Sequence, residues 1–178
     1  MRSLRVRILV ESAVMIALAT VLSLVKVYSM PQGGSVTAAS MLPIMLIGFR
    51  WGPRAGITAG IVYGIVQYFE EPFMVHPVQV LLDYPVAFGL LGLAGFFRGR
   101  EPARIVAGLT AGALGRYLAH VVSGVVFFAE YAPEGVPPLT YSLVYNLFIF
   151  PELVLMVLIG LIVVPRLQVD AARQAGSA

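Results

Sequence analysis

Long apolar stretches, separated by short polar turns that carry prolines and glycines, make up most of this chain. Breaking the sequence at these turns gives six stretches, at residues 9–29, 36–49, 55–70, 78–97, 105–129 and 140–165. A helix needs about 20 apolar residues to cross about 30 Å of hydrocarbon, and most of the stretches approach that length. The pattern predicts an all-α integral membrane protein, with a six-helix membrane domain at 1–166 and a short polar tail at 167–178.

The stretch 36–49 departs most from this pattern. It is short for a full crossing, and it follows the turn-rich sequence Pro31-Gln32-Gly33-Gly34-Ser35. We therefore expect a segment that is tilted, broken or partly shielded by its neighbours. Interrupted segments are often simple packing features, but in transporters they also border binding sites.

The composition supports a membrane protein and removes several kinds of chemistry. Of 178 residues, 59% are hydrophobic and 12% are charged, whereas soluble domains carry about 25% charged residues. The chain has no cysteine and only two histidines, so we expect no disulfide, no zinc-type cluster and no cofactor. It also lacks a G-x-x-x-x-G-K-[ST] loop, and Lys26 is its one lysine, so it does not hydrolyse nucleotides by itself.

The positions of the arginines predict the orientation. With six crossings, one side of the membrane receives Arg2, Arg5, Arg7, Arg50, Arg54, Arg98, Arg100, Arg104, Arg166 and Arg173. The opposite loops hold Glu70, Glu71, Glu130 and Glu134. Because positive loops stay inside, both termini are expected in the cytoplasm. The net charge of +3 then reflects topology, and we infer no nucleic-acid surface from it. The triplet Ala17-Leu18-Ala19 mimics a signal-peptidase site but lies in the middle of its apolar run, so no cleavage is expected.

Asp83 lies inside an apolar stretch, where a carboxylate is costly unless it is paired. At about 1.5 Å of rise per residue, Asp83 lies about five residues below the outer end of the fourth helix. On the same scale His120 lies about nine residues below the end of the fifth helix, and Asn146 about six below that of the sixth. The three polar side chains are therefore predicted to meet in the outer half of the bundle.

Polar and aromatic side chains surround this predicted meeting point, namely Gln79, Tyr84, Tyr117, Phe127, Phe128, Tyr141 and Tyr145. Singly, each aromatic also suits a lipid-facing or interfacial position. Together, ring faces attract a cation, and a carboxylate at low dielectric favours a positive charge or hydrogen-bond donors. The set predicts a pocket for a small cationic heteroaromatic molecule.

The buried charges have alternative pairings. Asp83 has possible internal partners in Arg116 and His120. Arg116, however, is nearer the level of Glu152, so we predict an Arg116–Glu152 pair that leaves Asp83 for the ligand.

Ala13 and Ala17 place small residues one turn apart on the first helix. Such a pair lets another helix approach closely, either in a partner subunit or within the bundle.

Several strings together resemble a known family. They are His76-Pro77-Val78-Gln79, Leu82-Asp83-Tyr84-Pro85, Arg116-Tyr117-x-x-His120 and Tyr141-Ser142-Leu143-Val144-Tyr145-Asn146, with Gly33-Gly34-Ser35 and Met41-Leu42-Pro43 earlier in the chain. The sequence resembles the thiamine-specific substrate-binding (S) components of energy-coupling-factor vitamin importers.

The resemblance implies a six-helix S component in a prokaryotic cell membrane, which captures thiamine from outside. Its partners would be a transmembrane coupling subunit, contacted by Ala13 and Ala17, and two ATP-binding subunits. The implied substrate-binding residues are Asp83, Tyr84, His120, Tyr141 and Asn146, to which we add Gln79, Phe128 and Gly124. Some members line the site with tryptophans, whereas Trp51 is the one tryptophan here and lies at the cytoplasmic side. We expect Phe128 to take the place of one such ring.

Other functions remain open from the residues alone. The chain also suits an S component for another vitamin or a stand-alone carrier of small cations. An intramembrane enzyme would use Asp83 and His120 as acid and base, but the sequence has neither an H-E-x-x-H motif nor a nucleophile elbow. We therefore expect no enzymatic activity.

Overall fold

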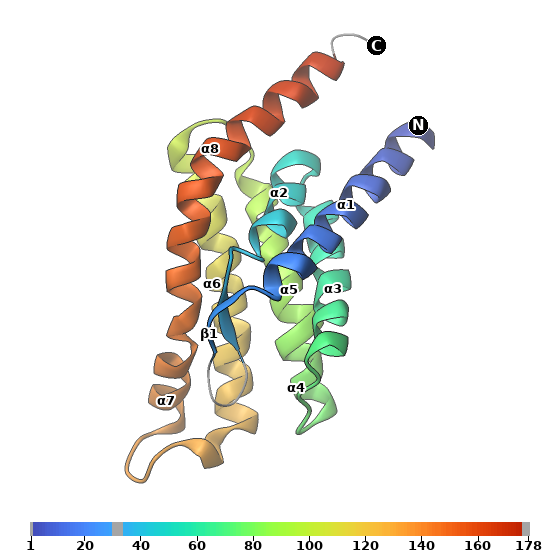
Figure 1. Cartoon of the computed structure of the whole chain (residues 1–178). Helices are drawn as coiled ribbons and strands as arrows, with labels where there is room; N and C mark the ends of the chain where they lie inside the picture. Colours follow the sequence, from blue (N-terminus) through green and yellow to red (C-terminus); the bar gives the residue numbers. More distant parts are fainter. Residues whose placement is uncertain (1, 30–33, 176–178) are drawn as a thin grey trace.

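The computed structural model describes residues 2–29 and 34–175, which form a helical bundle with one small two-stranded sheet (Figure 1). The helices of ten or more residues are α1 (Arg2–Ser23), α2 (Leu42–Trp51), α3 (Pro53–Glu70), α6 (Pro102–Phe127) and α8 (Ile149–Ala175). Another segment joins α4 (Pro77–Leu81), η1 (Leu82–Val86), α5 (Ala87–Gly89) and η2 (Leu90–Phe97). The last segment runs from α7 (Pro138–Tyr145) through η4 (Asn146–Phe148) into α8, and η3 (Ala129–Tyr131) is a single turn after α6.

The described residues thus form six helical segments, as predicted. Four of them are long and apolar enough to cross a membrane, namely Ser3–Ser23, Pro77–Phe97, Pro102–Phe127 and Pro138–Leu167. Residues 167–175 of the predicted polar tail continue α8, and residues 176–178 lie outside the described part.

The predicted ends of the first two stretches are wrong. Helix α1 ends at Ser23, and residues 26–29, predicted as helix, form β1 (Lys26–Ser29). This strand pairs antiparallel with β2 (Ser35–Thr37), and helix resumes only at Leu42. Val25 and Val27 are β-branched and suit a strand, and the pairing satisfies backbone groups that the broken helix leaves open. Of the turn-rich sequence that prompted caution, residues 31–33 lie outside the described part.

Helix α2 is short, and its neighbours enclose it. Every residue from Leu42 to Phe49 is buried. A Cβ added at Gly48 would lie 3.0 Å from the backbone nitrogen of Gly95, and one at Gly92 would lie 2.1 Å from that of Ile57. Small residues therefore let α2, α3 and η2 pack backbone to backbone, which is common between membrane helices. This is the shielding that the short stretch predicted.

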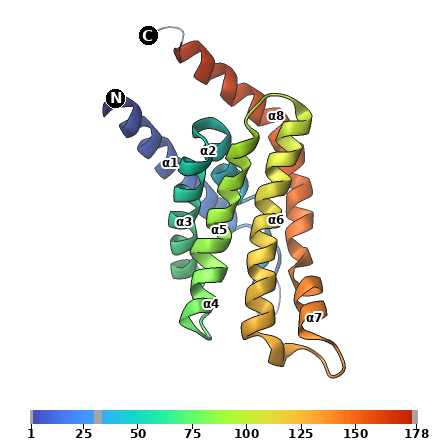
Figure 2. The same ribbon diagram turned by 180° about the vertical axis from the view of Figure 1, so that it is seen from behind.

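The two ends of the bundle differ. Both termini lie at one end, while the α3–α4 turn and α7 lie at the other (Figures 1 and 2). At the end with the termini, Arg98 donates through Nη2 to the backbone oxygen of Arg50 at 2.8 Å. There Trp51 also donates its indole N–H to Glu11 at 2.8 Å. Trp51 therefore lies away from α7 and the α3–α4 turn.

Candidate functional site

A cavity of about 330 Å³ opens between α3, α4, η1, α6, α7 and the hairpin strand β2. Ligand sites in proteins typically enclose about 300–1,000 Å³. All eight residues predicted to bind substrate line it, namely Gln79, Asp83, Tyr84, His120, Gly124, Phe128, Tyr141 and Asn146. The structure therefore brings together residues from three separate helical segments. Their role in binding remains a prediction.

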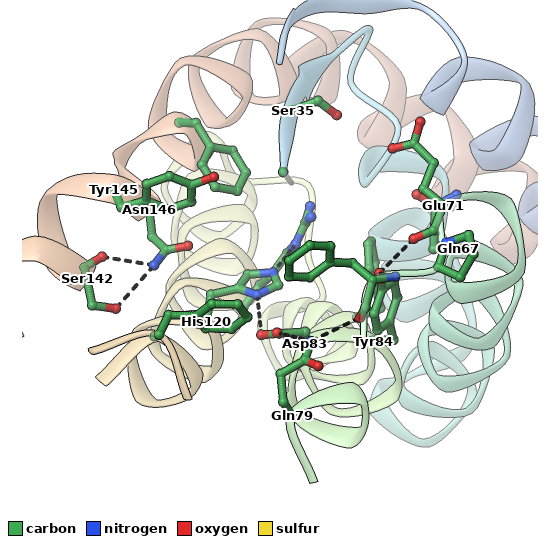
Figure 3. Close-up of a pocket in the computed structure, with 18 of the residues that line it drawn as sticks. Ser35, Gln67, Glu71, Gln79, Asp83, Tyr84, His120, Ser142, Tyr145 and Asn146 are labelled. Carbon is green, nitrogen blue, oxygen red and sulfur yellow. Dashed lines mark hydrogen bonds and ion pairs between the residues drawn. The ribbon is translucent and has the colours of Figure 1, made fainter. Parts of the chain in front are cut away.

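Asp83 occupies an irregular turn of the fourth segment. Residues Leu82–Val86 form a π-helical turn that contains Pro85. Proline lacks an N–H and crowds the preceding turn, so the helix widens there, and such turns are frequent at functional sites. The Asp83 side chain points into the cavity, where its Oδ2 accepts a hydrogen bond from Nε2 of Gln79 at 2.7 Å (Figure 3).

The other oxygen of Asp83 contacts His120. Oδ1 of Asp83 lies 3.0 Å from Nδ1 of His120, and the two side chains are 15% and 14% exposed. Nε of Arg116 donates to Nε2 of His120 at 3.2 Å, one helical turn away. Because Nε2 accepts, the proton of a neutral imidazole resides on Nδ1 and is donated to Asp83. The carboxylate therefore receives two donors from its own chain.

This arrangement corrects the predicted pairing. Arg116 makes no ion pair with Glu152 among the described side chains. Its guanidinium carbon instead lies 4.3 Å from the ring centroid of Phe88. Glu152 accepts from Thr37, through Oγ1 at 2.6 Å, and from Ser40. Arg116 and Glu152 lie at similar depth in the membrane but do not pair, because each side chain contacts other residues around its helix.

Aromatic rings form the walls of the cavity. Phe128 stacks on Phe73, with ring centroids 5.9 Å apart. The ring centroids of Tyr141 and Tyr145, both on α7, lie 5.8 Å apart. Ring faces are thus available to a flat or cationic ligand.

Tyr84 presents its ring to the cavity while its hydroxyl holds the neighbouring turn. It donates to the backbone oxygen of Glu71 at 2.8 Å and accepts from the backbone N–H of Phe73 at 3.2 Å (Figure 3). The α3–α4 turn is therefore fixed against the fourth segment. Two other predicted neighbours lie outside the cavity lining: Tyr117 donates to the backbone oxygen of Leu143, and Phe127 stacks on His76.

The α7 side of the cavity depends on close helix contact. Nδ2 of Asn146 donates to the backbone oxygen of Ser142 at 2.9 Å (Figure 3). Ser142 Oγ donates in turn to the backbone oxygen of Val121 at 2.9 Å. A Cβ at Gly124 would lie 2.1 Å from Ser142 Oγ. Gly124 therefore lets α7 approach α6 and bring Asn146 to the cavity.

Several lining residues were not predicted, namely Gly34, Ser35, Gln67, Glu71, Pro72, Phe73, Phe88, Arg116, Ser142 and Phe148. Arg116 and Ser142 precede His120 and Asn146 by four residues, so helical periodicity places each pair on one face and identifies both. Gly34 and Ser35 line the cavity because they belong to the hairpin. Helical periodicity in the sequence does not indicate a hairpin.

The alanines of α1 lie on the outside of the bundle. Ala13 and Ala17 are exposed, whereas Ala19 is fully buried and Met15 and Ile16 pack against the core. The alternative in which Ala13 and Ala17 pack α1 within its own bundle is therefore not seen.

Comparisons with known proteins agree with the site and the fold. The family model described as thiamine transporter protein (Thia_YuaJ) matches residues 9–172. The thiamine transporter ThiT of Bacillus subtilis (strain 168) is 46% identical over 153 residues, covering 78% of this chain and 79% of the relative. ThiT of Lacticaseibacillus paracasei (strain ATCC 334) is 28% identical over 192 residues, covering 96% and 93%.

A solved structure matches as well. The ThiT structure from Listeria monocytogenes superposes with a TM-score of 0.75 at 26% identity, covering 93% of this chain and 95% of that one. The match confirms the predicted all-α membrane fold. This chain is a multi-pass membrane protein that belongs to the thiamine transporter protein family.

Proposed function

We propose that this chain is the thiamine-binding subunit of an energy-coupling-factor vitamin importer in a prokaryotic cell membrane. Its relatives are described as thiamine transporters. The chain supplies a cavity with a carboxylate, an imidazole and aromatic walls. It acts as a binding subunit and catalyses no reaction.

Thiamine carries an aminopyrimidine and a positively charged thiazolium ring. The carboxylate of Asp83 accepts one donor at each oxygen from its own chain, and an ionised carboxylate offers about four acceptor positions. It therefore retains capacity for the amino group of the aminopyrimidine. The thiazolium lies against the ring faces of Phe128, Tyr141 and Tyr145, which attract a cation.

The cavity faces the outside of the cell in this proposal. Arg98 donates to the backbone oxygen of Arg50 at the end of the bundle that carries both termini. By the positive-inside rule this end is cytoplasmic, and the end with the α3–α4 turn and α7 is external. Thiamine then enters from the external medium.

Energy for uptake comes from partner subunits. The sequence lacks a phosphate-binding loop of the Walker type. A transmembrane coupling subunit contacts α1 through Ala13 and Ala17, whose small exposed side chains permit close helix approach, and it links this chain to two ATP-binding subunits.

The contact between Asp83 and His120 inside an aromatic cavity is the observation that carries the proposal. The test is mass spectrometry of small molecules released from the purified, denatured protein, followed by titration calorimetry with the molecule found. Thiamine in stoichiometric amount is expected. Another vitamin or another small cation would replace thiamine in the proposal, and a molecule chemically altered during incubation would indicate an enzyme.

A further inference from the structure

Arg116 is a buried cation at the edge of the cavity. It is 8% exposed and lines the cavity with its guanidinium over Phe88. One donor, Nε, is used by His120. Among the described side chains no carboxylate lies within ion-pair distance of it.

Glu152 is a buried anion behind the hairpin wall. It is 1% exposed, and it accepts from the backbone N–H of Thr37 at 3.3 Å, the Thr37 hydroxyl at 2.6 Å and the Ser40 hydroxyl at 3.3 Å. These neutral donors stabilise the ionised form of a carboxylate but do not cancel its charge. Glu152 does not line the cavity, so it acts on a ligand only through its field or through the hairpin.

The charges of Asp83, Glu152, Arg116 and His120 do not sum to zero. Asp83 and Glu152 contribute two negative charges, Arg116 one positive charge, and His120 none in the tautomer that its contacts select. Glu71 also lines the cavity, but Lys26 pairs with it at the mouth. One excess negative charge therefore remains in a low-dielectric region, where charge interactions are strong.

We infer that Arg116 and Glu152 are specificity-determining residues that set the buried charge of the empty site at minus one, so that the site selects a monocation. Binding of a singly charged cation brings the buried charge to zero. A neutral ligand of the same shape leaves it uncompensated, and a phosphorylated, anionic ligand increases the imbalance. This inference rests on the proposed function, because it assigns to that same cavity the charge that its ligand must carry.

The test compares two ligands of the same shape in the purified full-length chain. Thiamine is one, and the other is its isostere in which a neutral thiophene replaces the thiazolium. Titration calorimetry gives the charge preference, defined as the dissociation constant of the isostere divided by that of thiamine. Charges roughly 10 Å apart at an effective dielectric constant of about 20 change an affinity by about tenfold. Glu152→Gln is therefore expected to lower the charge preference by about tenfold.

A matched variant separates the field of Glu152 from its structural role. Thr37→Val removes the hydroxyl that binds Glu152 but no charge, so it is expected to weaken both ligands equally and leave the charge preference unchanged. Equal weakening of both ligands by Glu152→Gln would overturn the inference, because Glu152 would then act only by holding the hairpin.

Variants of Arg116 provide a second, independent test. Arg116→Gln raises the excess to two negative charges and is expected to increase the charge preference, whereas Arg116→Lys keeps the charge and is expected to leave it unchanged. These two variants decide the question if Glu152→Gln does not fold, and an unchanged preference in Arg116→Gln would overturn the inference. Failure of the parent protein to bind either ligand would instead contradict the proposed function.

Discussion

Asp83 and His120 are 37 residues apart in the sequence, yet Oδ1 of one lies 3.0 Å from Nδ1 of the other inside the cavity. The contact joins the π-helical turn of the fourth segment to the middle of α6. It orients the carboxylate before a ligand arrives. Preorganisation of this kind raises affinity, because less conformational freedom is lost on binding.

His120 supports Asp83 without carrying a charge of its own. His120→Ala removes the N–H donor to Asp83 and leaves Nε of Arg116 without its acceptor. Because His120 acts on the ligand through Asp83 and carries no charge, thiamine affinity should fall by about tenfold or less, which is a smaller loss than removal of the Asp83 charge causes. Titration calorimetry measures the loss. A loss above a hundredfold would mean that His120 binds the ligand as a cation.

The orientation of the bundle is testable in intact cells. The loop between η2 and α6, which holds Arg100, lies at the end with the termini, whereas Glu134 lies in the loop between α6 and α7, and both residues are exposed. A single cysteine at Glu134 should react with a membrane-impermeant reagent added outside, and one at Arg100 should react only after the membrane is permeabilised. Labelling of the Arg100 position from outside would contradict the assignment of the termini to the cytoplasm.

The lone tryptophan reports on events far from the cavity. Trp51 contacts Glu11 at the end with the termini and does not line the cavity. Saturating thiamine should therefore change Trp51 fluorescence only weakly in the isolated protein. Strong quenching that follows saturation would show that ligand binding rearranges the opposite end of the bundle.

The exposed alanines of α1 allow capture to be separated from uptake. Ala13→Leu and Ala17→Leu add bulk to a face that touches neither the cavity nor the core, so binding by the isolated protein should stay unchanged. Uptake by cells that contain the coupling subunits should fall by about tenfold or more, since close helix approach tolerates little added volume. Val14→Phe, at an exposed position beside this face, is the control and should retain uptake. Equal loss of binding and uptake would assign the alanines to folding.

Helical rise and periodicity account for the parts of the site that the sequence predicted. Counting residues from the helix ends placed Asp83, His120 and Asn146 at one level, and the three line one cavity. The same counting failed for Arg116 and Glu152, because depth does not specify the direction in which a side chain points around its helix. The true partners of Glu152 are hydroxyls more than a hundred residues earlier in the chain.

Helical rise and periodicity did not predict the hairpin or the α3–α4 turn, because both depend on contacts between distant parts of the chain. The mostly apolar residues 24–29 resemble a continuation of α1 in the sequence, and pairing with β2 makes residues 26–29 a strand. Gly34 approaches the ring of Phe148 so closely that an added Cβ would lie 2.8 Å from it, a tertiary contact that no local pattern encodes. Likewise the Tyr84 hydroxyl binds the backbone of the α3–α4 turn, which only the fold brings within reach.

The affinity of Asp83→Asn for thiamine tests the central claim most directly. Asparagine keeps the size of the side chain and removes its charge, and a hydrogen bond to a charged group contributes roughly 1.5–3 kcal/mol. Each 1.4 kcal/mol is about tenfold in affinity, so titration calorimetry should show binding weakened by between about ten- and a hundredfold. Glu130→Gln, an exposed carboxylate outside the cavity, should bind as the parent does. If folded Asp83→Asn binds thiamine as tightly as the parent protein, Asp83 is a structural residue and this cavity is not where thiamine is recognised.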